Sequence, residues 1–206
     1  MDRWDWKREL KALYQPKAGV VSEIDVPEMS FLMIDGAGDP NGSPEFVAAV
    51  SALYTISYTL KFARKKAGAG PEYSVMPLEG LWWAPDLTVF GSDHDDKSSW
   101  LWTAMIAQPP FVKADEVEAA RSEAIAKKGA VEAGAVRFEP YAEGPSVQIM
   151  HIGPFATEGP DIAALHARIA ELGSKPSGHH HEIYLSDPAR TAPEKLKTVV
   201  RQSYAR

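Results

Sequence analysis

Cysteine is absent from this sequence of 206 residues, so disulfides, thiolate zinc sites and cysteine nucleophiles are excluded. A net positive charge is absent too. The formal charge is -6 at pH 7, which argues against nucleic-acid binding because phosphate binding requires a basic surface. The first residues, Met1–Arg8, are too polar for a signal peptide, and we expect no apolar run long enough to span a membrane. We therefore expect a soluble cytoplasmic protein with no nucleic-acid partner and no membrane partner.

Several catalytic and nucleotide-binding motifs are also missing. The sequence contains no Gly-x-x-x-x-Gly-Lys, no His-Glu-x-x-His and no Gly-x-Ser-x-Gly. We expect no bound nucleotide, no serine nucleophile and no organic cofactor. Hydrophobic residues make up 45% and charged residues 24%, as in ordinary globular proteins, and the length suits one large domain or two small halves that share a core.

The first half of the chain reads as strand, turn, helix, strand, strand. The apolar pattern predicts a strand over 20–34, followed by a turn rich in Gly, Asp and Pro. A helix follows, with Ser43 as N-cap and Pro44 at its first position, and it ends at the glycines before Pro71. Two further strands are predicted over 73–84 and 100–108.

The second half repeats this order. An amphipathic helix is predicted over 113–128, with Val117, Ala120, Ala124 and Ile125 on its inner face. Strands at 136–141 and 147–152, a helix at about 161–172, the strand near residue 182 and a last strand at 195–202 complete the half. The expected fold class is α+β, with tandem duplicated strand–helix–strand–strand modules, antiparallel sheets with helices on one side, and a central groove on a pseudo-twofold axis. We expect a 1–19 extension before one domain, 20–206, with halves of about 20–110 and 111–206.

The most informative segment is a strand, 179–185, that ends at Asp187-Pro188. Because strand side chains alternate between faces, His180, Glu182 and Tyr184 share one face. A carboxylate and a phenol on one face form a candidate site for a cation or for acid–base chemistry. The alternative is a solvated edge strand with a few polar residues.

Three segments carry a family resemblance: Glu79-Gly80-Leu81-Trp82-Trp83, His151-Ile152-Gly153-Pro154, and Glu182-x-Tyr184-x-x-Asp187-Pro188. From about residue 20 to residue 202 the chain closely resembles the GyrI-like (gyrase-inhibitor-like) small-molecule-binding domain family. The resemblance implies two tandem modules around a central ligand groove. Members often follow a helix-turn-helix domain in multidrug-sensing regulators, and the first twenty residues here are too short for one. The double tryptophan resembles stand-alone members that hydrolyse cyclopropane-bearing, DNA-alkylating natural products, which implies chemical self-protection.

The resemblance makes Glu182 and Tyr184 the candidate catalytic residues. In drug-sensing relatives the matching glutamate lies among aromatic residues and pairs with lipophilic cations. A carboxylate in such a pocket loses hydration, so we expect the pKa of Glu182 to rise toward neutrality, as a general base for water requires. The alternative is a strand carboxylate that accepts a hydrogen bond from backbone or arginine. Tyr184 would orient water or donate to a ligand carbonyl; alternatively it is a half-buried strand aromatic.

A ligand-binding surface is expected around these two residues. Trp82 and Trp83 point to opposite faces of a regular strand, so only one faces the groove unless Gly80 forms a bulge. That tryptophan would stack on a flat aromatic or cationic ligand, and the other would pack in the core. Further candidate lining residues are Glu79, Tyr54, Tyr58, Trp102, Phe111, Tyr141, Met150 and His180.

Other histidines are given no metal role. His179 and His181 point away from His180 in a strand, so the three do not converge on a metal ion. His151 is interpreted as a structural strand-end residue, and His94 with its three neighbouring aspartates as a solvated loop. Three functions remain open: a cofactor-independent hydrolase of strained rings, a non-catalytic multidrug-binding or sequestering protein, and a gyrase-modulating interaction protein.

Overall fold

The computed structural model describes residues 3–84 and 97–206, and it divides into two compact units. Unit 1 comprises Met1–Asp5 and Met29–Pro140, and unit 2 comprises Trp6–Glu28 and Tyr141–Arg206. Helices and antiparallel strands are mixed in both, so the predicted α+β class is confirmed. The boundary between the units lies at residues 140–141 rather than at 110–111, where the halves were expected to meet. The reason is that the helix after residue 113 belongs to unit 1. Most of the predicted acidic loop around His94 lies outside the described residues.

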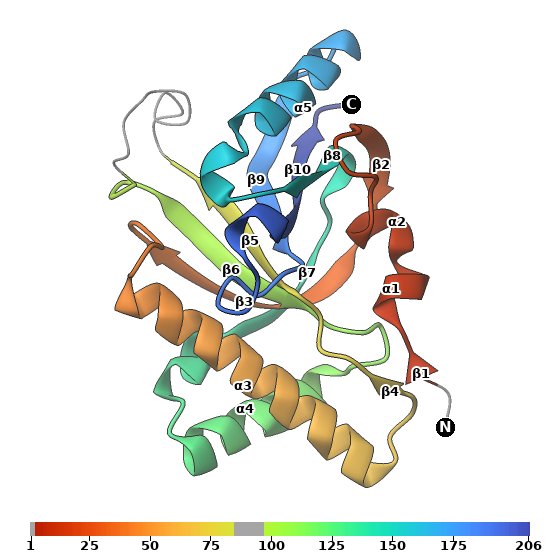
Figure 1. The fold of residues 1–206 in the computed structure, drawn as a ribbon. Helices are drawn as coiled ribbons and strands as arrows, with labels where there is room; N and C mark the ends of the chain where they lie inside the picture. Colours follow the sequence, from red (N-terminus) through yellow and green to blue (C-terminus); the bar gives the residue numbers. More distant parts are fainter. Residues whose placement is uncertain (1–2, 85–96) are drawn as a thin grey trace. The chain divides into compact units, whose positions relative to one another are not determined.

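Unit 1 is built on strands in the order β5-β6-β3-β7. These strands are β3 (Met29–Ala37), β5 (Leu78–Trp83), β6 (Leu101–Ala107) and β7 (Arg137–Tyr141). Helix α3 (Pro44–Ala67) packs on β3 and β6, and α4 (Ala114–Lys128) and the 3-10 helix η2 (Val131–Ala135) pack on α3 (Figure 1). A short parallel pair joins β1 (Arg3–Trp4) to β4 (Glu72–Tyr73).

Local signals set the ends of α3 as predicted. The Ser43 hydroxyl accepts a hydrogen bond from the Phe46 amide at 3.2 Å, and Gly68 ends the helix with a φ of 63°. Helix α3 is long and apolar enough to cross a membrane by length and mean hydropathy alone (1.3 over 18 residues). The prediction that no apolar run is long enough to span a membrane was therefore wrong. Its buried side chains, Leu53 and Ile56 among them, nevertheless pack inside unit 1, as in the core helix of a folded domain.

Unit 2 is built on strands in the order β2-β8-β10-β9. These strands are β2 (Ser22–Val26), β8 (Gly144–Ile152), β9 (Pro176–Tyr184) and β10 (Lys197–Tyr204). Helix α5 (Gly159–Glu171) covers β8 and β10, after the 3-10 turn η3 (Phe155–Thr157). Its core consists of Val147, Ile149, Leu165, Ile169 and Val200. Near the N-terminus lie two short helices, α1 (Trp6–Glu9) and α2 (Lys11–Tyr14), and the turn η4 (Pro193–Lys195) precedes β10.

Two local predictions were wrong. The predicted strand over 20–34 is two strands, β2 and β3, which belong to different units and are separated by Pro27 and Glu28. Proline lacks the amide that a continuous ladder requires. Ile125 is 40% exposed rather than on the inner face of α4, whereas Val117, Ala120 and Ala124 are buried as predicted.

The two units share one order of elements. In unit 1 it is β3, α3, β5, β6, and in unit 2 it is β8, α5, β9, β10. In each case the first strand pairs with the last, and the last pairs with the one before it. Each unit therefore presents a sheet face covered partly by its own long helix.

Candidate functional site

Glu182 and Tyr184 form a direct pair on β9. The Tyr184 hydroxyl donates to Glu182 Oε2 at 2.8 Å. On the other carboxylate oxygen, Oε1, His180 Nε2 lies 3.3 Å away, and the His180 and Glu182 side chains are each only 15% exposed. The ring of Phe155, in η3, meets the Tyr184 ring edge-on with centroids 5.6 Å apart. The expected alternation therefore brings a carboxylate, a phenol and an imidazole together beside an aromatic wall.

Strand register places this group on the face of unit 2 that carries α5. Glu182 is opposite Val200 of β10, which is in turn opposite Ile149 of β8. Val200 and Ile149 both pack against α5. Because directly opposed residues share a face, the Glu182 group lies on the α5 side of the sheet.

The neighbouring histidines are held toward the neutral form. Burial, and then the nearby His180, lower the pKa of His166 on α5. Burial alone lowers the pKa of His179. His166, which interacts with His180, therefore adds no positive charge to the Glu182 group near pH 7, and His179, which alternation places on the opposite face of β9, is neutral there too.

In unit 1 the tryptophans lie against glycines. A Cβ on Gly80 would approach Trp82 Nε1 to 2.7 Å, and a Cβ on Gly36 would approach Trp102 Cζ2 to 2.1 Å. Glycine inside a strand permits this close approach of an indole to the backbone. Phe46 of α3 packs on both indoles, with centroid distances of 5.8 Å to Trp82 and 5.0 Å to Trp102. Both tryptophans therefore lie on the α3 side of their sheet and are almost fully buried.

Gly80 does not form a bulge. The β5–β6 register is unbroken from Leu78 to Trp83, so alternation places Trp83 on the opposite face from Trp82. Glu79 shares the Trp83 face and is only 1% exposed, while Trp83 is half-buried. Trp82 is thus the one that packs on Phe46 in the core, and it also lies 6.0 Å from the ring of Trp100.

The other unit 1 candidates fall into two places. Tyr54 and Tyr58 stack one turn apart on α3, with centroids 6.3 Å apart, and Tyr58 is 43% exposed. Phe111 packs against Trp4 and Tyr73 instead, near the end of α3 that carries Arg64. Since α3 rises about 1.5 Å per residue, that end lies roughly 27 Å from Phe46 and its tryptophans. The structure does not bring Phe111 to the tryptophan cluster.

Met150 and Tyr141 of unit 2 are also separated from the Glu182 group. Met150 is opposite Val199, which is opposite Ile183, so it faces away from Glu182. Burial, with Glu143 nearby, raises the pKa of Tyr141 to about 12. Met150 is therefore not brought beside Glu182, and Tyr141 lies near Glu143 and Arg201 instead.

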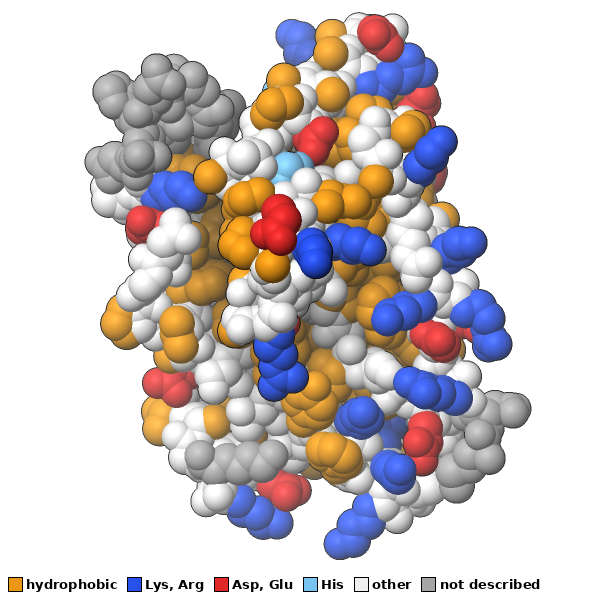
Figure 2. All heavy atoms as spheres, viewed as in Figure 1, with side chains coloured by type: hydrophobic (Ala, Val, Ile, Leu, Met, Phe, Trp, Pro, Cys, Tyr) orange, Lys and Arg blue, Asp and Glu red, His pale blue; other side chains and the backbone are white. Residues whose placement is uncertain are grey.

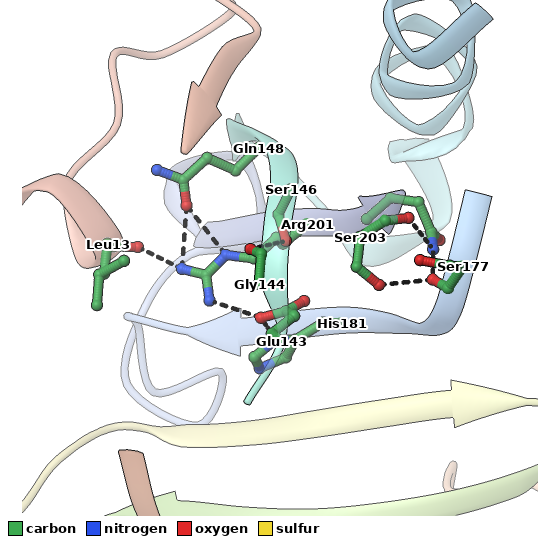
Figure 3. Close-up of polar contacts among 10 residues, drawn as sticks. Leu13, Glu143, Gly144, Ser146, Gln148, Ser177, His181, Arg201 and Ser203 are labelled. Atoms are coloured by element: carbon green, nitrogen blue, oxygen red, sulfur yellow. Dashed lines mark hydrogen bonds and ion pairs between the residues drawn. The ribbon is translucent and has the colours of Figure 1, made fainter. Parts of the chain in front are cut away.

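That opposite face holds a buried polar network which the sequence analysis missed. Arg201 is its centre: Nη1 donates to Glu143 Oε2 at 3.0 Å, Nε donates to Gln148 Oε1 at 3.1 Å, and Nη2 donates to the Leu13 carbonyl at 2.7 Å (Figure 3). His181 Nδ1 lies 3.0 Å from the same Glu143 oxygen. Burial would raise the pKa of Glu143, but the charges and hydrogen bonds of His181 and Arg201 outweigh it and lower the pKa to about 2. The network fixes the α2 end of the N-terminal segment on the face away from Glu182.

Phe155 was also missed as a site residue, although an apolar residue inside the turn from Gly153 to Pro160 was a usable signal.

His151 is structural, as predicted: Nδ1 lies 2.7 Å from Asp161 Oδ2, and Nε2 lies 3.2 Å from the Pro154 carbonyl oxygen. Within residues 3–84 and 97–206, no group of three His, Asp or Glu side chains is placed to hold a metal ion.

Comparison with solved structures gives full-length relatives. An uncharacterized conserved protein from Listeria innocua is 40% identical, with a TM-score of 0.89 over 98% of this chain and 100% of that chain. Two hydrolases from Listeria innocua are 38% and 37% identical, with TM-scores of 0.84 and 0.86 over 98% and 99% of this chain and all of theirs. No match was found among curated proteins. The sequence profile of the GyrI-like small molecule binding domain matches residues 20–201, and the chain belongs to that family.

Proposed function

We propose that the protein is a cofactor-independent, cytoplasmic hydrolase that binds flat aromatic or cationic small molecules and opens a strained electrophilic ring of the cyclopropanoid type by Glu182-assisted addition of water. One observation carries the proposal: a largely buried carboxylate, Glu182, is held by Tyr184 and flanked by His180. The similarity to two Listeria hydrolases over the full chain supports a hydrolytic reaction.

The chemistry needs only water and a base. Water attacks the unsubstituted ring carbon, a C–O bond forms and the strained C–C bond breaks. The electron pair moves through the conjugated system to the carbonyl oxygen, which becomes a phenolate. Glu182 takes the proton from the attacking water and passes it to that phenolate, so charge and atoms balance. No covalent enzyme intermediate is required.

The neighbours of Glu182 have distinct roles in this scheme. The Tyr184 hydroxyl donates a hydrogen bond to Glu182 Oε2 and so fixes the orientation of the Glu182 carboxylate. The Phe155 ring packs against the Tyr184 ring and fixes it in turn. A carboxylate offers about four acceptor positions, so it can hold Tyr184 and still accept a water. Of the two tryptophans, Trp83, which lies on the face away from Phe46, stays a predicted ligand contact.

The test is turnover of a duocarmycin-like cyclopropane alkylator, followed by mass spectrometry of the intact and water-added species. We expect many turnovers by the wild-type protein and a loss of roughly 100-fold or more in Glu182→Gln, in the range typical of a removed general base. Tyr184→Phe should retain binding with a smaller loss of kcat. The matched control is Glu194→Gln, an exposed glutamate of unit 2, which should hydrolyse normally.

Two outcomes would contradict the assignment. If Glu182→Gln turns over at the wild-type rate, the base lies elsewhere. If the wild-type protein binds the compound, seen as quenching of tryptophan fluorescence, but never releases the water-added product, the protein sequesters ligands rather than hydrolysing this class.

A further inference from the structure

Helix α3 leaves an apolar face open to solvent. From residue 46 to residue 60 the helix contains no charged residue. Surface helices normally carry charged side chains on the face that water contacts, and a helix that is apolar all round is normally buried. Yet Val47 is 62% exposed, Tyr58 is 43% exposed and Phe62 is 58% exposed, and Ser51 between them is exposed too. Only 39% of the most apolar 18 residues of α3 are buried, so part of this surface lacks a cover.

The exposed side chains form one continuous face. Positions 47, 51, 58 and 62 are separated by four and seven residues, which places them on one side of a helix. The rings of Tyr54, Tyr58 and Phe62 stack in sequence along it, with centroids 6.3 and 6.2 Å apart. We call this surface the outer face of α3, and its residues are Val47, Ser51, Tyr54, Thr55, Tyr58 and Phe62. Its C-terminal half is aromatic and wide, whereas its N-terminal half carries only small side chains.

Charge is also divided between the two ends of α3. No basic residue occurs over 39–60, and the exposed side chains of Asp39 and Glu45 make this end acidic. No acidic residue occurs over 60–67, and the basic residues there are Lys61, Arg64, Lys65 and Lys66. Lys61 is at the margin of the outer face itself, with Nζ 5.7 Å from the centre of the Phe62 ring. Figure 2 shows Lys and Arg side chains gathered near this end of the helix, beside hydrophobic ones.

An antiparallel pair of α3 helices would bring the unlike halves of this face together. When the pair is centred between Tyr54 and Thr55, Val47 of one copy is opposite Phe62 of the other, and Ser51 is opposite Tyr58. Each layer then holds one aromatic and one smaller side chain, so that ridges meet grooves. The acidic end of each helix also meets the basic end of the other, whereas a parallel pair would place like charges together.

From these observations we infer that the outer face of α3 is the interface of a weak homodimer, in which α3 packs antiparallel on α3 of a second copy about a twofold axis. The same patch then serves both subunits, as a twofold interface requires. One helix face is smaller than the roughly 800 Å² per partner of a stable interface, so this dimer dissociates readily on dilution. The inference is independent of the proposed hydrolysis, because the face contains no residue of the Glu182 group. It assigns Tyr58 to a protein interface rather than to a ligand groove.

The first test is disulfide cross-linking, which is direct because the chain contains no cysteine. Val47→Cys and Phe62→Cys are mixed in equal amounts and oxidised mildly, and we expect a cross-linked heterodimer. Each variant alone should stay monomeric, because the two copies of either residue are about 22 Å apart along an antiparallel pair, and a disulfide spans at most about 7 Å between Cα atoms. The matched control is Ala63→Cys, an exposed neighbour of Phe62 that points to another side of the helix. Mixed with Val47→Cys, it should give no more product than the single variants.

The second test is sedimentation equilibrium of the unmodified chain at roughly 10 to 300 µM, the range in which a small interface associates. We expect a reversible monomer–dimer equilibrium. Ser51→Arg, at an exposed residue in the middle of the face, should keep the fold and weaken the dimer about tenfold or more, because it brings a charge from each copy into an apolar interface. Ala63→Arg is the matched control and should dimerise like wild type.

Two results would overturn the inference. A wild-type chain that stays monomeric over the whole concentration range would leave the outer face of α3 to a partner of another chemistry. Equal cross-linking in the single variants and in the mixture would show that the two copies do not pair antiparallel through this face.

Discussion

The buried charge of Glu143 permits a quantitative test of what stabilises unit 2. The Glu143 side chain is 2% exposed, and its Oε2 accepts from Arg201 at 3.0 Å, with His181 also at 3.0 Å. Replacing Glu143 by Gln keeps the shape and removes the charge, and it leaves the Arg201 guanidinium, 3% exposed, without its counter-charge. Breaking a buried pair in this way costs about 3–5 kcal/mol in known cases.

The pKa of Glu143 gives a second figure for the same effect. Burial opposes ionisation, yet the charges of His181 and Arg201 carry the pKa from 4.5 down to about 2. A difference of about 2.5 units, at 1.36 kcal/mol each, corresponds to roughly 3 kcal/mol of folding free energy. Because the folded-state pKa is the lower one, this stability is fully present above about pH 4.5. It is lost as the pH falls from there toward about 2.

We therefore expect Glu143→Gln to lower the free energy of unfolding by roughly 3 kcal/mol at pH 7, measured by urea denaturation followed by circular dichroism. The gap between wild type and variant should narrow between pH 4.5 and pH 2, because the wild-type protein loses the contribution there. Glu194→Gln, on the surface, should stay within about 0.5 kcal/mol of wild type. A loss as small as that of the control, or a gap of equal size at pH 3 and pH 7, would refute the reasoning.

Two further expectations concern unit 1. Gly36→Ala would place a Cβ 2.1 Å from Trp102 Cζ2, so we expect the free energy of unfolding to fall by about 1–3 kcal/mol or more, measured by thermal unfolding. The matched control is Gly134→Ala, which has no atom within 4 Å of the added Cβ and should melt like wild type. Ser43→Ala removes the hydroxyl that caps α3 and should cost about 1 kcal/mol, whereas Ser43→Asp should restore most of it; an Ala variant as stable as wild type would show that the cap contributes nothing.

Features set by neighbouring residues were predictable from the sequence. Ser43 and Gly68 lie at the two ends of α3 and cap it through contacts a few residues away, so both ends could be placed. The shared face of His180, Glu182 and Tyr184 follows from the period of a strand and needed no tertiary information. The resemblance to the GyrI-like family rested on short segments of this kind, and the family was confirmed.

Features set by distant residues were not predictable. Arg201 lies in a last strand of mixed polar and apolar residues, and nothing in its neighbourhood distinguishes a buried arginine from an exposed one. Its acceptors on Gln148 and Leu13 are 53 and 188 residues away. The division of residues 20–34 between two units likewise depends on which strand each segment joins, and one proline was the only local sign of it.

The hydrogen bonds that hold α2 extend the folded unit beyond the residues that the family profile matches. The similarity to the family begins at residue 20, yet the Leu13 and Ala12 carbonyls accept hydrogen bonds from Arg201 and Gln148 inside unit 2. A chain shortened to the region that the profile matches would lose both hydrogen bonds, each of which contributes about 0.5–3 kcal/mol net. The region that the family profile matches is therefore shorter than the folded unit of this protein, and residues outside the profile help to keep its last strand in place.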